Sequence, residues 1–533
     1  MSRKLSFLVL AVIVALQSGA MFYWASRKAF FHIDELYTFE TVQSVNHHDN
    51  HREYLTDSPM WTQERWIPVE ELKTRFTIEE GESVLDLPFP VSAKKFFKGR
   101  NYMWIVNALE SVFGGKVSLE WICLCFNILV WLLFQVLFFC FMAGVLGLDR
   151  RTALLAVAMW GFCPMVLGLA VFCRFYPWTL LLFLVVLVFH KLMWDSDSHK
   201  KNIVYEFAAF FLMYLAFKNS ELILVLGGSL AFFFTAGLIA RKRYSQALYY
   251  SVPITLGSLF YIGNKTTFGK ILFNFSHYAA NGEGAVMEHA SFFVNSSIVE
   301  KLYALIRPMR TFATEIAGQR FLFLVELLLL ALLFFSVKKR PLGSLVKGFP
   351  LILVGVIVVF WLFCGLGGFM YSRYYSFLFL LVFIFLWTVF DKLVRGYRKE
   401  RLVFIIASCV VFAGALYPSF AGKINYVYSK EKSSVGQVAA YKDLPSVVNY
   451  NEEINFNAYY SALLLDEDSS VFPICDYPSD GILPDLPDSF LFFTYPDSST
   501  EPMSGLIREG GYSMAFLCDL LSFTSVYLCE KNE

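Results

Sequence analysis

Residues 118–194 read SLEWICLCFNILVWLLFQVLFFCFMAGVLGLDRRTALLAVAMWGFCPMVLGLAVFCRFYPWTLLLFLVVLVFHKLMW, and three long apolar runs fill this stretch. The runs cover about residues 118–147, 152–172 and 176–194, and each is long enough to cross a bilayer as a helix of roughly 20 residues. Only short polar segments interrupt them. In lipid an isolated backbone segment satisfies its own hydrogen bonds only as a helix, so the pattern predicts a polytopic α-helical membrane protein.

The same pattern extends in both directions along the 533-residue chain, which is 57% hydrophobic and only 17% charged. Soluble proteins usually carry about 25% charged residues. We expect about 11 transmembrane helices in all, the others lying near 5–24, 203–217, 220–240, 246–263, 320–337, 348–368, 374–391 and 402–420. The first run resembles a cleaved signal peptide, but it continues through Met21–Trp24 and so favours a retained anchor. The net charge of +1 gives no indication of a nucleic-acid partner.

Basic residues predict the orientation, because short cytoplasmic loops are enriched in Lys and Arg. With these spans, the short-loop clusters all fall on one side: Arg3-Lys4, Arg150-Arg151, Lys200-Lys201, Arg241–Arg243, Lys338–Arg340 and Arg395–Arg401. The N-terminus is therefore expected in the cytoplasm. Loop 25–117, loop 264–319 and the tail 421–533 are expected outside, and the basic stretch Lys94-Lys95 to Arg100 lies in the first of these loops.

The composition changes after residue 420, where Pro, Asp, Ser and Asn become common and the apolar runs shorten. Residues 1–420 therefore form the predicted transmembrane domain, and 421–533 a small extracytoplasmic α/β domain of βαβ type. Its expected strands and helices are Ser446–Tyr450, Phe456–Leu465, Ser489–Tyr495, Glu501–Glu509 and Ser513–Leu517. Cys475, Cys518 and Cys529 allow one disulfide outside the membrane.

Five charged residues near the expected outer ends of spans are candidates for function: Asp34, Glu35, Arg174, Lys218 and Arg373. Taken singly, each has an ordinary explanation. Acidic residues suit the start of a helix, an Arg can extend its head group to the interface, and Lys218 can pair locally. Together they are less ordinary, because the positive-inside rule disfavours basic residues in short outer loops. A lipid-linked phosphate on that side would bind the arginines.

Four motifs occur in a characteristic order: Asp34-Glu35 after the first span, Asn101–Trp104 with Phe113-Gly114 before the second, Cys173–Tyr176 followed by Thr179–Leu182, and Ser372-Arg373-Tyr374 opening a late span. In this order they resemble the GT-C glycosyltransferases that use polyprenyl-phosphate sugars, including protein O-mannosyltransferases and lipid A aminoarabinose transferases. Two features depart from the pattern. The His-Pro-Pro of bacterial relatives is absent near Gly99–Asn101, and the first loop carries His47, His48 and His51.

The resemblance implies transfer of a sugar from a polyprenyl-phosphate donor to a hydroxyl of a lipid, glycan or protein acceptor. Asp34 would be the general base, with Glu35 orienting it or helping to hold a divalent cation. Arg174 and Arg373, with Lys218 as a weaker third, would bind the donor phosphate. Inversion at the anomeric carbon is expected.

The implied location is a cell membrane, bacterial by expectation, with the active site and C-terminus outside. A transporter or flippase, or a polymerase or ligase for lipid-linked glycans, remains the alternative. Loop 264–319 is expected to be an ordinary solvated loop, with a lid over the donor site as the other option.

Overall fold

The computed structural model describes residues 1–44, 65–73, 83–263, 295–316, 348–367, 371–395, 399–421, 424–428, 432–450, 456–475, 485–495, 501–521 and 524–532. The chain divides into two units, each described by itself. The helical unit comprises Met1–Phe22, Ile128–Ala170 and Phe175–Asn425. The sheet unit comprises Tyr23–Asn127, Val171–Arg174 and Tyr426–Glu533.

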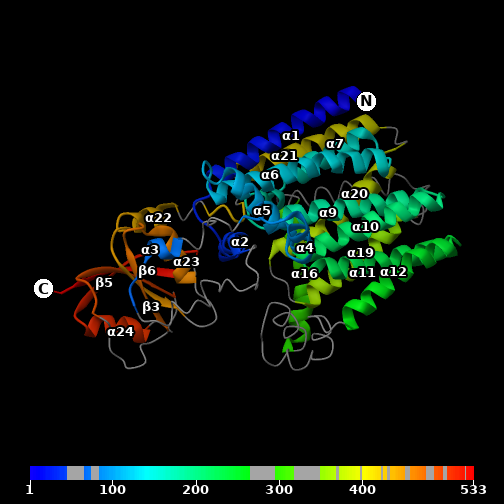
Figure 1. The fold of residues 1–533 in the computed structure, drawn as a ribbon. Coiled ribbons are helices and arrows are strands. Elements are labelled where there is room, and N and C mark those ends of the chain that lie inside the picture. The colour runs from blue at the N-terminus through cyan, green and yellow to red at the C-terminus, as the bar shows by residue number, and fades with distance from the viewer. Residues whose placement is uncertain are drawn as a thin grey trace. The chain divides into compact units, whose positions relative to one another are not determined.

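Long helices make up the helical unit (Figure 1). They are α1 (Arg3–Ser26), α6 (Leu119–Phe139), η3 (Cys140–Val145), α7 (Arg150–Phe162), α8 (Pro164–Ala170), α9 (Tyr176–Asp195), α10 (His199–Asn219), α11 (Leu222–Ala240), α12 (Tyr244–Gly263), α16 (Ile298–Glu315), α19 (Phe349–Leu366), α20 (Ser372–Val394) and α21 (Glu400–Ala421). The last residues of α1 and the first residues of α6 belong to the sheet unit. The predicted class, a polytopic α-helical membrane protein, is confirmed.

Six helices among the described residues are long and apolar enough to cross a membrane: α1, α6 with η3, α9, α11, α19 and α20. The pair α7 and α8 makes a seventh if it is one span. The predicted spans at 203–217, 246–263 and 402–420 are helices α10, α12 and α21, which do not meet that criterion. The predicted span at 320–337 lies outside the described residues, so a total of about 11 stays a prediction.

Proline explains why α7 and α8 are two helices rather than one, with a bend of 58° between them. Pro164 has no N–H to donate and disfavours helical backbone at the residue before it. Cys163 accordingly has extended backbone, with ψ of 148°. The predicted span 152–172 is therefore broken.

The described part of the predicted loop 264–319 is helical rather than irregular. Helix α16 begins with a capping box, in which the Ser297 side chain accepts from the Glu300 amide and Glu300 accepts from the Ser297 amide. The helix packs against α19 and α20, and the ring centroids of Phe312 and of Phe379 in α20 lie 5.3 Å apart. The remainder, 264–294 and 317–319, lies outside the described residues.

A six-stranded sheet forms the centre of the sheet unit, in the order β1-β3-β2-β4-β6-β5. The strands are β1 (Ile67–Pro68), β2 (Ser446–Tyr450), β3 (Ser470–Cys475), β4 (Ser489–Thr494), β5 (Tyr512–Leu520) and β6 (Thr524–Lys531). Strands β3, β2 and β4 are parallel, and the other neighbours are antiparallel. Because β1 comes from the first loop and pairs with β3, that loop and the tail share one sheet.

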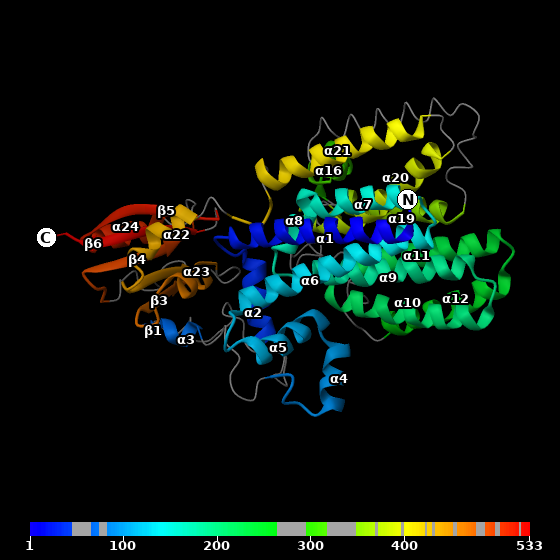
Figure 2. The same ribbon diagram turned by 90° about the horizontal axis from the view of Figure 1, so that it is seen from above.

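The described part of this unit also contains short helices: α2 (Ile33–Ser44), α3 (Val69–Lys73), α4 (Phe89–Lys98), α5 (Asn101–Phe113), α22 (Lys432–Ala439), α23 (Phe456–Leu464) and α24 (Glu501–Glu509). Of these, α3, α22, α23 and α24 contact strands of the sheet. Helix α2 packs against α5 (Figure 2). Between them, the Asn107 side-chain amide donates to the Val42 carbonyl at 2.8 Å. The α/β class of the tail is confirmed, as are the five elements predicted within it.

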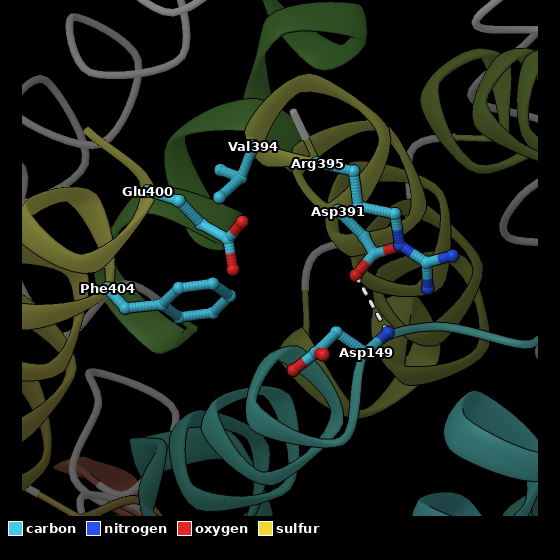
Figure 3. A pocket seen from close by; sticks show the side chains of 6 residues that line it. All are labelled: Asp149, Asp391, Val394, Arg395, Glu400 and Phe404. Carbon is cyan, nitrogen blue, oxygen red and sulfur yellow. Dashed lines mark hydrogen bonds and ion pairs between the residues drawn. The ribbon is translucent and has the colours of Figure 1, made fainter. Parts of the chain in front are cut away.

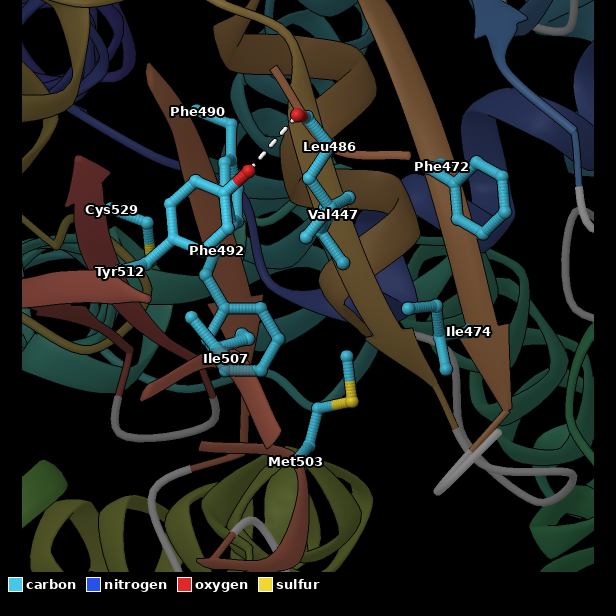
Figure 4. Packing of buried hydrophobic residues seen from close by; sticks show 10 residues of the cluster. All are labelled: Val447, Phe472, Ile474, Leu486, Phe490, Phe492, Met503, Ile507, Tyr512 and Cys529. Atoms are coloured by element: carbon cyan, nitrogen blue, oxygen red, sulfur yellow. Dashed lines mark hydrogen bonds between the residues drawn. The ribbon is translucent and has the colours of Figure 1, made fainter. Parts of the chain in front are cut away.

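Apolar side chains from strands β2 to β6, from α24 and from the segment before β4 fill one core of the sheet (Figure 4): Val447, Phe472, Ile474, Leu486, Phe490, Phe492, Met503, Ile507, Tyr512 and Cys529. Burying a side chain of this size contributes about 1.5–3 kcal/mol. Tyr512 is the residue of this core with a side-chain hydroxyl, and that hydroxyl donates a hydrogen bond to the Leu486 carbonyl at 2.9 Å. Cys518 and Cys529 are free thiols, so neither forms the disulfide that the sequence allowed.

Candidate active site

The candidate site in the sheet unit begins at the first turn of α2, in the stretch His32-Ile33-Asp34-Glu35. The His32 Nδ1 accepts from the Asp34 amide at 3.1 Å, and a Glu35 carboxylate oxygen accepts from the His32 amide at 2.8 Å. This is the reciprocal arrangement of a capping box, with His in place of Ser or Thr. These contacts fix the start of α2 and the direction of the Glu35 carboxylate.

Glu35 is fully buried and joins separate segments of the unit. Its Oε2 lies 2.9 Å from the Lys28 Nζ, and its Oε1 accepts from the Cys173 amide at 2.8 Å. Lys28 also donates to the Tyr426 carbonyl at 2.5 Å. Burial raises the pKa of Glu35, while the Lys28 ammonium acts in the opposite direction. Glu35 thus connects the end of α1, the 171–174 turn and the start of the tail.

Asp34 differs from Glu35 in exposure, although the two residues are adjacent. The Asp34 side chain is 25% exposed, whereas that of Glu35 is 0% exposed. A ligand entering from solvent can therefore reach the Asp34 carboxylate. The His32 ring is the neighbouring group, with Nδ1 3.5 Å from Asp34 Oδ2.

Arg174 lies against the same turn of α2. Its Nη1 donates to the Asp34 carbonyl at 2.7 Å and to the Thr38 hydroxyl at 3.0 Å. The guanidinium is therefore held beside Asp34 and does more than extend toward the interface. The sequence-predicted residues Asp34, Glu35 and Arg174 thus come together in one unit.

Asn127 and Tyr102 support the turn that carries Arg174. The Asn127 side-chain amide donates to the Phe172 carbonyl at 2.7 Å, and its Oδ1 accepts from the Tyr102 hydroxyl at 3.1 Å. Both side chains are fully buried. Phe172 also stacks on Tyr426, with ring centroids 4.1 Å apart. The turn is thus fixed from α5, α6 and the tail.

Helix α23 of the tail contacts the segment before α2. The rings of Phe30 and Tyr460 lie 4.7 Å apart, and Tyr460 is fully buried. Burial raises the pKa of Tyr460, and the negative charge of Glu35 adds to the effect. The tail is therefore part of the surroundings of the Asp34–Glu35 turn.

Arg373 belongs to the helical unit, at the first turn of α20, and is 5% exposed. Its guanidinium carbon lies 4.5 Å from the Tyr371 ring centroid and 5.1 Å from that of Tyr374. The same end of α20 carries a polar group: Asn425 donates to Glu315 Oε1 at 2.7 Å and reaches the Ser372 hydroxyl at 3.5 Å.

Lys218 also belongs to the helical unit. It lies in the last turn of α10, half-buried, with its Nζ 5.9 Å from the Tyr214 ring centroid. A cation is favourable at a helix C-terminus, and this accounts for its position without a ligand. Its role in donor binding stays a prediction.

The predicted metal site can be tested against the donor atoms of the acidic pair. Both Glu35 carboxylate oxygens already accept hydrogen bonds from protein groups, so Glu35 does not fit as a metal ligand. Within the described ranges, no group of three or more His, Cys, Asp or Glu side chains could hold a metal ion. Asp34 alone is too small a ligand set to define a site.

A pocket in the helical unit lies at the junction of α7, α20 and α21 and has a volume of about 330 Å³; Figure 3 shows its lining residues Asp149, Asp391, Val394, Arg395, Glu400 and Phe404. Its carboxylates are paired. Asp391 lies 2.7 Å from the Arg395 Nε, and Asp149 and Glu400 both bind Arg151. Asp391 also accepts from the Asp149 amide, at the start of α7. These contacts explain the pocket as a structural ion network at the end that carries the predicted cytoplasmic clusters.

The sequence analysis did not single out Lys28, His32 or Asn127, and it gave no role to Tyr102, which lies in the motif Asn101–Trp104. Lys28 carried the same signal that singled out Arg174, a basic residue on the side where the positive-inside rule disfavours it. His32 could have been found as a cap, because it stands three residues before Glu35 at a helix start. The supporting role of Tyr102 and Asn127 could not be predicted, because their hydrogen-bond partners lie far away in sequence.

No protein-family model and no curated protein matches this chain. Solved structures are similar to it, and two of them are ArnT structures. ArnT from Cupriavidus metallidurans bound to undecaprenyl phosphate is 13% identical with a TM-score of 0.50, over 97% of each chain. The apo state of ArnT from the same organism gives the same identity and TM-score over 99% of this chain and 98% of that chain. The chain therefore shares the overall fold of these ArnT structures.

Proposed function

We propose that the protein is a membrane glycosyltransferase that moves a sugar from a polyprenyl-phosphate donor to an acceptor hydroxyl on the extracytoplasmic side. The observation that carries this proposal is the placement of the Arg174 guanidinium on the Asp34 carbonyl, beside a carboxylate that solvent can reach. The fold shared with ArnT, which was solved with undecaprenyl phosphate, supports the choice of donor class.

Asp34 is the proposed general base. As the acceptor oxygen forms its bond to the anomeric carbon, its proton passes to the Asp34 carboxylate. The bond between the anomeric carbon and the phosphate oxygen breaks, and the electron pair leaves with the polyprenyl phosphate. Attack from the face opposite the phosphate inverts the anomeric centre. The acceptor is a lipid, a glycan or a protein.

Arg174, Arg373 and Lys218 are the proposed groups for the donor phosphate, whose negative charge grows as the bond breaks. Arg can offer a phosphate two parallel donors, which Lys cannot. Glu35 is a positioning residue in this proposal. Its buried contacts with Lys28 and Cys173 hold the Asp34 turn and the Arg174 turn in one arrangement.

Transfer by the purified full chain in detergent tests the proposal. A synthetic polyprenyl-phosphate carrying a labelled sugar is the donor, and extracted membrane lipids, glycans and proteins are the acceptors. The expected result is a labelled acceptor together with released polyprenyl phosphate. Labelled donor that crosses a vesicle bilayer without cleavage would instead indicate a flippase.

Protease access to intact cells tests the proposed sidedness. We expect cleavage within the tail from the outer face, because the short-loop basic clusters are assigned to the cytoplasm. Protection of the tail until the membrane is permeabilised would contradict this orientation.

A further inference from the structure

The proposed transfer chemistry leaves one basic cluster unexplained, the stretch from Lys94-Lys95 to Arg100 in the first loop. The positive-inside rule gives no reason for this cluster, because the loop is long and expected outside. In the structure its lysines belong to helix α4, a separate short helix beside α5 (Figure 2). No residue of α4 is buried.

Helix α4 has two chemically different faces. At about 100° per residue, Phe89, Ala93, Phe96 and Phe97 fall on one side of the helix. The three lysines, Lys94, Lys95 and Lys98, fall on the opposite side. Residues 89–100 contain no Asp or Glu. This separation of aromatic and cationic side chains is typical of helices that lie in a membrane interface.

The aromatic face is exposed to an unusual degree. Phe89 is 83% exposed and Phe97 is 38% exposed. An exposed apolar face of this kind is unfavourable in water and marks a surface that contacts a partner or a membrane. Gly99 and the helix α5 follow α4, and the apolar helix α6 begins at Leu119 within the same unit. From α4 the chain therefore leads through α5 into a helix that is long and apolar enough to cross a membrane.

We propose that α4 lies in the interface of the bilayer leaflet on the side of the first loop and binds anionic phospholipid headgroups there. Phe89, Phe96 and Phe97 enter the boundary between headgroups and acyl chains. Lys94, Lys95 and Lys98 contact the lipid phosphates, and each Lys near an anionic surface strengthens binding about fivefold. A bilayer fits better than a protein partner, because charge and aromatic residues are separated around the helix and a membrane span follows. The proposal does not depend on the transfer chemistry.

Hydrogen–deuterium exchange of the full chain in nanodiscs tests this proposal. The two lipid compositions are phosphatidylcholine alone and phosphatidylcholine mixed with phosphatidylglycerol. We expect amides of residues 89–98 to exchange several-fold more slowly in the anionic nanodiscs. High salt should reduce the difference, because it screens charges at the membrane surface. Equal exchange in both lipids would overturn the proposal.

Two variants separate the contributions of the two faces. Lys94→Glu/Lys98→Glu should abolish the difference between the lipids, and Phe89→Ser/Phe97→Ser should speed exchange in both. Arg508→Glu is the matched control, an exposed basic residue in the last turn of α24, and should change neither value. Exchange of the β4–β6 strands reports whether each variant keeps its fold. Retention of the lipid effect by the folded lysine variant would also overturn the proposal.

Discussion

The Lys28 Nζ lies 2.9 Å from the Glu35 Oε2, and both side chains are almost entirely buried, with exposures of 1% and 0%. The pair connects the segment around residues 28–35 with two segments that are distant in sequence. The Glu35 carboxylate accepts from the Cys173 amide, and the Lys28 ammonium donates to the Tyr426 carbonyl. A buried ion pair need not stabilise a fold relative to apolar residues, but loss of one partner leaves an uncompensated charge. The adjacent Asp34 therefore depends on this pair for its position.

Removing one member of the pair should be worse than removing both. We expect Lys28→Met or Glu35→Gln to destabilise the protein by about 3–5 kcal/mol, and the double variant to recover much of the loss. Lys28→Met should be less destabilised at pH 5 than at pH 8. In this variant the Lys28 ammonium no longer lowers the pKa of Glu35, and burial raises it. The variant therefore loses stability as the pH rises and the Glu35 carboxyl ionises. Unfolding of the purified protein in detergent measures these values.

An exposed ion pair in the same unit provides the control. Arg65 and Glu71 lie 3.3 Å apart with side chains 47% and 40% exposed. Their replacement by Ala, singly or together, should cost less than about 1 kcal/mol. Additive effects of the Lys28 and Glu35 replacements would show that the pair does not act as a unit.

Asn127 should be needed for the shape of the Arg174 turn. Asn127→Ala removes the donor to the Phe172 carbonyl and the acceptor for the Tyr102 hydroxyl. Both of these hydrogen bonds are buried. Each buried group that loses its partner costs about 1–3 kcal/mol. We expect a lower unfolding temperature and faster amide exchange at residues 171–175. Tyr102→Phe removes only the hydroxyl and should have a smaller effect; unchanged exchange in Asn127→Ala would contradict the role given to Asn127.

Glu315 should make the stability of the helical unit depend on pH. Burial raises its pKa to about 7 from the usual 4.5, so the folded state holds the proton more tightly than the unfolded state. Stability should therefore fall as the pH rises from about 4.5 to about 7. Glu315→Gln cannot ionise and can still accept from Asn425. It should match the wild type below about pH 4 and exceed it at pH 8 by up to about 3 kcal/mol.

Unfolding of the Glu315→Gln variant across this pH range is compared with that of Glu221→Gln, which replaces an exposed carboxylate in the same unit. The control should follow the wild type at every pH. A Glu315→Gln variant that is less stable than the wild type at pH 8 would mean that the folded protein stabilises the ionised carboxylate.

The sequence predicted the helices and the α/β tail because those signals are local. An apolar run such as Phe349–Leu366 is helical in a bilayer whatever its neighbours, and Ser446–Tyr450 lies between turn residues. Strand β3 was missed because Pro473 stands within it, and proline normally argues against an interior strand. Strand β1 is two residues long and forms only by pairing with β3, across a large sequence separation.

The candidate site was predictable only in part for the same reason. Asp34 and Arg174 could be singled out by charge and expected sidedness. The difference between Asp34 and Glu35, one reachable and one buried, depends on Lys28, Cys173 and the fold around them. No pattern of spacing reports such contacts.

Replacing Arg174 or Arg373 by Lys should affect the transfer rate less than replacing it by Ala. If they bind a phosphate, Lys keeps the charge but not the paired donors and should be a partial substitute. Ala should raise the barrier for transfer by about 2–4 kcal/mol at either position. Thr38→Val removes one Arg174 contact without removing its charge and should have a smaller effect. The measurement is transfer from a synthetic polyprenyl-phosphate sugar, and equal rates for Arg, Lys and Ala would exclude phosphate binding at that position.

In the proposed reaction Asp34 accepts the proton of the acceptor hydroxyl, and Asp34→Asn removes this capacity. Asn keeps the size of the side chain and its hydrogen bonding but cannot take up the proton. The transfer rate of the purified variant, measured with the same synthetic donor and at equal protein level, should fall by about 10²–10⁴-fold while unfolding stays close to that of the wild type. A folded Asp34→Asn protein that transfers sugar at a near-normal rate would contradict the account.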